Sequence, residues 1–96
     1  MDRDEARAIL EAHLESFRRR SYAELVGLIG DVQVSEVTGP SGAVYQIEVE
    51  VLWDSARERT LIHVLGAIDD GRLPGALLPV TDSFIVVPDG SSSNAG

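Results

Sequence analysis

The sequence contains no cysteine and no lysine, and its aromatic residues are few: two Tyr, two Phe and one Trp. Without cysteine, the chain cannot form a disulfide, a thiolate zinc site or a thiol nucleophile. No apolar run is long enough to cross a bilayer, and the charged N-terminal residues lack the apolar core of a secretory signal. These absences predict a cytoplasmic protein with no membrane partner.

Acidic residues outnumber basic ones by sixteen to eight, which gives a formal net charge of -8. The long-range field therefore repels phosphate backbones, and we expect no nucleic-acid partner. Ninety-six residues with 44% hydrophobic and 25% charged side chains suit one folded domain with one core. We predict a single domain over residues 1–90 and a flexible tail over 91–96, because the serine-rich tail has nothing to bury.

Two capping boxes mark helix starts, at Asp2 and at Ser21, each with a glutamate three residues later. After the first box, apolar residues recur at helical spacing, which predicts a helix over residues 3–19. The second box predicts a short helix over Tyr22–Ile29, ended by a glycine in the left-handed turn. The apolar stripe of the first helix consists of Ala6, Leu10, Leu14 and Phe17.

From Val32 onward the hydrophobic period changes from 3.6 to 2. The clearest alternation runs from Tyr45 to Trp53, with the odd-numbered side chains apolar. Consecutive strands without crossover helices predict an α+β fold, in which the two helices pack on one face of a four-stranded antiparallel meander. The predicted strands are Val32–Thr38, Tyr45–Trp53, Thr60–Ile68 and Asp82–Val87, with a long loop over Arg72–Thr81.

The turn Gly39-Pro40-Ser41-Gly42 sets the register that we expect for the first hairpin. Taken as a four-residue loop, it pairs residues whose numbers sum to 81, which places Val34 opposite Ile47. Both side chains would then face the helices. The predicted outer face carries apolar Val37, Val44, Leu52, Leu61 and Leu65 among polar Gln33, Ser35, Gln46, Glu48, Glu50 and His63.

A register summing to 113 in the second hairpin places His63 opposite Glu50, with Glu48 diagonal to it. The histidine and its carboxylate could form a general base with an orienting group. The simpler interpretation, which we favour, is an exposed cross-strand ion pair. Neither histidine has zinc-ligand spacing and no serine lies in a nucleophile elbow, so we predict no metal, no cofactor and no catalytic residue.

An apolar patch ringed by polar groups suits association. The leading hypothesis is therefore a non-enzymatic interaction or adaptor domain, which binds a protein partner or itself through the outer sheet face. The alternative is that the helices or the 72–81 loop cover these leucines. The candidate interaction residues are Glu48, Glu50, Leu52, Leu61, His63 and Leu65.

Two further hypotheses remain open. A helix over a curved sheet can enclose a small-molecule pocket, enzymatic or not, which Tyr45, Trp53 and Phe84 would floor. Alternatively, the charge of -8 would steer the surface of a basic protein toward this chain.

Several short segments carry a family resemblance. They are Tyr-Ala-Glu-Leu-Val-Gly-Leu-Ile-Gly from Tyr22, Tyr-Gln-Ile-Glu-Val from Tyr45, Trp53-Asp54, Ile68-Asp69-Asp70-Gly71, Asp82-Ser83-Phe84-Ile85 and Pro88-Asp89-Gly90. Together they resemble a family of small uncharacterised bacterial proteins, over Tyr22 to Gly90. The resemblance implies no activity and transfers no functional residue.

Overall fold

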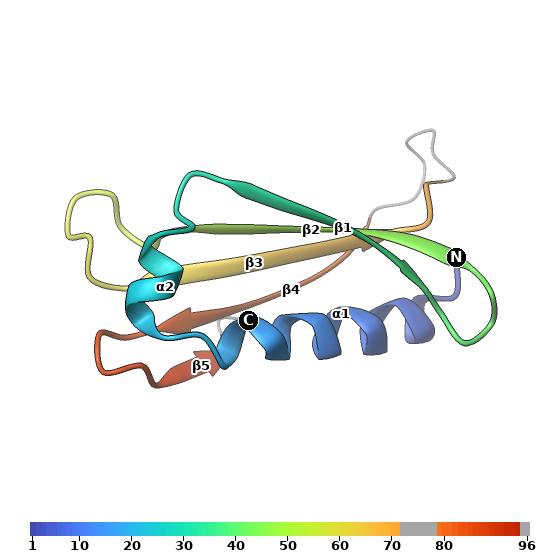
Figure 1. Cartoon of the computed structure of the whole chain (residues 1–96), viewed down its shortest axis with the longest axis horizontal. Coiled ribbons are helices and arrows are strands. Elements are labelled where there is room, and N and C mark those ends of the chain that lie inside the picture. The colour runs from blue at the N-terminus through green and yellow to red at the C-terminus, as the bar shows by residue number, and fades with distance from the viewer. Residues whose placement is uncertain (72–78, 95–96) are drawn as a thin grey trace.

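A computed structural model describes residues 1–71 and 79–94. Two helices precede an antiparallel sheet whose strands neighbour one another in chain order, β1-β2-β3-β4-β5 (Figure 1). The elements are α1 Arg3–Arg18, α2 Tyr22–Val26, β1 Val32–Thr38, β2 Val44–Trp53, β3 Ile62–Asp69, β4 Val80–Val86 and β5 Ser92–Asn94. The α+β class and the antiparallel meander are confirmed.

The predicted number of strands was wrong, because the described residues form five strands rather than four. The additional strand, β5, pairs with the end of β4 and lies in the segment that we expected to be a tail. A tight turn brings it back, in which Gly90 N donates to Val87 O at 2.9 Å and Ser91 N donates to Asp89 Oδ1 at 2.8 Å. Its serines show no hydrophobic alternation, so no periodicity revealed it.

Both helices begin where the capping boxes predicted. Asp2 accepts a hydrogen bond from Glu5 N at 3.0 Å. At the second start, Ser21 Oγ accepts from Glu24 N at 3.1 Å while Glu24 Oε1 accepts from Ser21 N at 3.0 Å. These bonds satisfy backbone donors that have no partner within the helix. Both helices end earlier than predicted, α1 at Arg18 and α2 at Val26.

The core lies between the helices and one face of the sheet, and α1 contacts β3 and β4 (Figure 1). The predicted stripe of α1 is buried, and so are Tyr45, Ile47, Val49 and Val51 of β2, as the alternation predicted. Gly66 of β3 allows the helix to approach closely, since a Cβ there would lie 2.9 Å from a methyl carbon of Leu10. The two layers are therefore packed tightly at this point.

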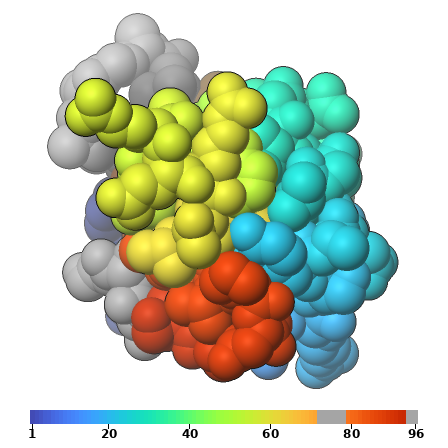
Figure 2. Space-filling view, turned by 90° about the vertical axis from the view of Figure 1, so that its left-hand side faces the viewer, coloured from blue at the N-terminus to red at the C-terminus, as the bar shows by residue number. Residues whose placement is uncertain are grey.

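Three segments meet at one end of the molecule: α2, the β2–β3 loop and the β4–β5 turn (Figure 2). The hydroxyl of Tyr22 donates a hydrogen bond to the backbone oxygen of Thr60 at 2.7 Å, which joins α2 to the β2–β3 loop. Leu25 of α2 is fully buried in the core. The short helix thus closes this end of the core.

The predicted register of the first hairpin was wrong by one residue: Val34 lies opposite Glu48, not Ile47. The loop closed by the backbone hydrogen bond between Gly39 and Ala43 has three residues, 40–42, rather than four. Gly42 N donates to Gly39 O at 2.9 Å and Gly39 N donates to Ala43 O at 2.8 Å, while Gly42 adopts a φ of 89°. This is the three-residue loop with a left-handed glycine, and it reverses the face of every β1 side chain.

The register of the second hairpin was wrong by two residues: His63 lies opposite Leu52, not Glu50. The connection is longer than expected, and Asp54 N donates to Leu61 O at 2.8 Å across its base. Because side chains alternate with a period of two, this shift keeps every predicted face while changing every partner.

The predicted loop over 72–81 lies mostly outside the described residues, which omit 72–78. The following strand begins at Val80, where we expected Asp82, so two predicted loop residues belong to β4.

Candidate functional site

The sheet face opposite the helices is the candidate functional site, and we call it the outer face. Neither helix lies over it (Figure 1). The register and the alternating burial assign to it Val32, Val34, Glu36, Val44, Gln46, Glu48, Glu50, Leu52, His63, Leu65, Ala67, Asp69, Thr81, Ser83 and Ile85.

Exposed apolar side chains are concentrated on the outer face. The large hydrophobic residues with the most exposure in the described part of the chain are Val34 at 63%, Val32 at 52% and Val44 at 47%. Leu52 and Leu65 on the neighbouring strands are partly buried. An apolar surface of this kind, interleaved with polar groups, is typical of an interaction site.

Carboxylates alternate with these apolar residues across the strands. Glu48 lies between Val34 and Ala67, and Glu50 lies between Val32 and Leu65. The side-chain carboxylates of Glu36, Glu48 and Glu50 make no hydrogen bond or ion pair with any other residue that the structure describes. No arginine among the described residues belongs to this face, because the arginines lie in or beside α1 and in the β2–β3 loop.

A shallow hollow of about 240 Å³ interrupts the outer face. It forms where small residues of β3 lie beside longer neighbours. Its lining includes Val32, Glu48, Glu50, Leu65, Ala67 and Thr81. The hollow therefore combines an apolar floor with two carboxylates.

His63 has a different carboxylate partner from the one predicted. Its Nδ1 lies 3.7 Å from Oδ1 of Asp54, an ion pair only when the imidazole is protonated and longer than a hydrogen bond. Nε2 is buried and has no hydrogen-bond partner in the described part of the chain. A general base needs an orienting hydrogen bond at one ring nitrogen and access at the other, so this geometry gives no support to the base hypothesis.

The structure brings five of the six predicted interaction residues onto the outer face, and Leu61 lies directly before β3, partly buried. The assignment of Gln33, Ser35 and Val37 to this face was wrong, because the one-residue shift turns them toward the helices. For the same reason Val32 and Val34 were not predicted to lie on this face. Pro40 and Gly42 could have indicated the correct loop, because proline favours the start of the turn and glycine readily adopts a positive φ.

The three predicted pocket residues do not lie together. Tyr45 and Phe84 are buried in the core, and Trp53 lies at the opposite end of β2 from Tyr45. Phe84 packs beneath Arg18, whose guanidinium carbon lies 4.5 Å from the ring centroid. Tyr45 and Phe84 therefore belong to the core, and Trp53 is partly buried against it.

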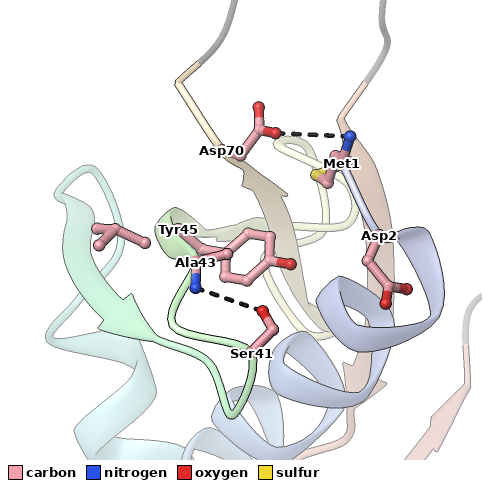
Figure 3. Close-up of a pocket in the computed structure, with 7 residues that line it drawn as sticks. Met1, Asp2, Ser41, Ala43, Tyr45 and Asp70 are labelled. Carbon is pink, nitrogen blue, oxygen red and sulfur yellow. Dashed lines mark hydrogen bonds and ion pairs between the residues drawn. The ribbon is translucent and has the colours of Figure 1, made fainter.

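A surface pocket of about 400 Å³ lies at the Tyr45 end (Figure 3). Most of its polar groups form a hydrogen bond or an ion pair with a neighbouring residue. The hydroxyl of Tyr45 donates to Glu5 Oε1 at 2.6 Å, Ser41 Oγ accepts from Ala43 N at 3.3 Å, and the Met1 amino group lies 3.6 Å from Asp70. These contacts connect the start of α1 to the sheet.

No group of three or more His, Asp or Glu side chains within residues 1–71 and 79–94 could hold a metal ion. Over the same residues, neither helix has both the length and the apolar character needed to span a membrane. Comparisons with protein-family models, with curated proteins and with solved structures gave no match.

Proposed function

We propose that this chain is a non-enzymatic protein-interaction domain whose binding surface is the outer face. The observation that supports the proposal is the placement of the helices. They cover one face of the sheet and leave Val32, Val34 and Val44 exposed on the other. Exposed apolar area on a sheet is unfavourable in a free domain, and a partner that covers it recovers that free energy.

Site-specific photo-crosslinking in cells tests this proposal. A photoreactive side chain at Gln46, exposed on β2, reports on the outer face, and the same group at Ala8, exposed on α1, is the matched control. We expect protein adducts from position 46 and few from position 8. Equal adduct formation at both positions, or none at position 46, would contradict the proposal.

Light scattering on the purified protein then separates the two kinds of partner. If the adduct is a second copy of the chain, the protein is a dimer in solution, and replacing exposed Val34 with serine makes it monomeric. If the protein is a monomer, the adduct at position 46 contains another protein.

A further inference from the structure

The charge of the outer face limits the kinds of partner that it can bind. Resting on the proposed function above, we infer that the outer face binds an extended, cationic segment of another protein, on one face of which arginine or lysine residues are flanked by apolar side chains. Three features of the outer face support this inference: the sign of its charges, their spacing and the hollow beside them.

Within residues 1–71 and 79–94, the outer face carries charge of one sign only. Its four carboxylates are Glu36, Glu48, Glu50 and Asp69, and His63 is its only group that can become cationic in the described residues. The nearest carboxylate partner of that imidazole, Asp54, carries negative charge as well. A cationic partner therefore gains attraction over the whole face.

A second copy of this chain fits the face poorly. A symmetric dimer places the same patch of both copies together, so four carboxylates of one copy would meet four of the other. No arginine of the described chain lies on the face to separate them. Like charges in a desolvated interface oppose association, which favours a different, basic protein over self-association.

The spacing of the carboxylates matches an extended segment. Glu48 and Glu50 are two residues apart on β2, so their Cα atoms are about 7 Å apart. Side chains on one face of an extended segment repeat at the same interval. Two cationic residues at successive positions of that face would therefore meet Glu48 and Glu50, and apolar residues beyond them would reach Leu52 and Val44 at the ends of the same strand.

The hollow beside Glu48 and Glu50 suits one long cationic side chain. An arginine or lysine can lay its aliphatic stem against Val32, Leu65 and Ala67 while its charged end reaches the two carboxylates. Neither carboxylate has to release a partner within the described chain, because neither has one there.

A titration followed by nuclear magnetic resonance tests the inference on the full chain. The probe is a synthetic peptide that carries two successive arginines between valines on one face and serine on the other, and its glutamate counterpart is the control peptide. We expect the arginine peptide to shift the amides of β1, β2 and β3, and the affinity to fall as salt is added. The glutamate peptide should not bind.

Two charge-reversed variants locate the site. Glu48→Lys combined with Glu50→Lys should weaken peptide binding by at least about tenfold. Glu11→Lys combined with Glu15→Lys changes the net charge equally on exposed positions of α1 and should leave binding within about twofold. Equal loss in both variants, or shifts confined to α1, would overturn the inference, since attraction would then be nonspecific.

Failure of this inference is distinguishable from failure of the proposed function. The inference of a cationic partner would be overturned if the arginine peptide did not bind. It would also be overturned if the protein formed a dimer that substitutions on the outer face dissociate. Adducts from position 46 would still support an interaction domain in both cases. Absence of those adducts contradicts the proposed function itself.

Discussion

The hydroxyl of Tyr45 donates a hydrogen bond of 2.6 Å to Oε1 of Glu5, which connects β2 to the first turn of α1. The same carboxylate accepts bonds from Ser41 Oγ at 2.7 Å and from Ser41 N at 3.0 Å. One glutamate thus ties the β1–β2 turn and the start of the sheet to the helix. Because the bonds favour a charged carboxylate and a neutral phenol, both groups should titrate abnormally.

The first prediction concerns the phenol. The hydrogen bond to Glu5 and, secondarily, burial raise the pKa of Tyr45 from 10.0 to about 12. A raised pKa in the folded state contributes stability that is fully present below the unfolded value of 10.0 and is lost as pH rises through about 12. The phenolate absorbance of the native protein minus that of Tyr45→Phe should rise with a midpoint at this raised pKa. In Glu5→Gln the midpoint should move back toward 10.0, and an ordinary midpoint in the native protein would contradict the assignment.

The second prediction concerns the carboxylate. Hydrogen bonds from Tyr45 and Ser41 lower the pKa of Glu5 below its ordinary value of 4.5. A lowered pKa contributes stability that is present above 4.5 and is lost as pH falls through the folded-state value. Urea unfolding across this pH range should show that acid lowers the free energy of unfolding less in Glu5→Gln than in the native protein. Glu48→Gln, at a carboxylate without a partner in the described chain, is the control and should behave as the native protein does.

The sequence predicted the layers of this fold better than its pairings. Apolar periodicity located α1 and the inward side chains of β2, because burial of one face leaves a regular pattern. Register depends on loop length, which Gly39–Ala43 fixes through backbone geometry rather than hydrophobicity. An error of one residue there reversed the face of β1, whereas an error of two in the next hairpin changed only partners.

The candidate site was predictable to the same extent. Residues of β2 and β3 on the outer face followed from alternation alone. Val32 and Val34 depended on the first register and were missed. The contact of His63 with Asp54 also could not be predicted, because it depends on how the eight-residue connection from Asp54 to Leu61 folds.

The third prediction tests the close approach of α1 to β3. A side chain at Gly66 would meet Leu10 and Leu14, with a Cβ only 2.9 Å from a methyl carbon of each. Gly66→Val should therefore destabilise the domain by about 1–3 kcal/mol through overpacking. Ala67→Val, next in the sequence but on the outer face, should stay within about 0.5 kcal/mol. Urea unfolding measures the free energy of unfolding of both variants. Equal effects would show that the helix is not packed closely against the sheet at Gly66.

The fourth prediction tests the register of β1 and with it the composition of the outer face. Val34 is 63% exposed and opposite Glu48, so Val34→Lys should cost little apolar burial and add a cross-strand ion pair. The expected change is a stabilisation of about 0.2–1 kcal/mol, which should disappear when Glu48→Gln is added. Val49→Lys, at a fully buried position of β2, is the contrasting variant and should cost about 3–5 kcal/mol or prevent folding. If Val34→Lys is as damaging as Val49→Lys, Val34 faces the helices opposite Ile47, and the exposed valines on which the interaction surface depends are not there.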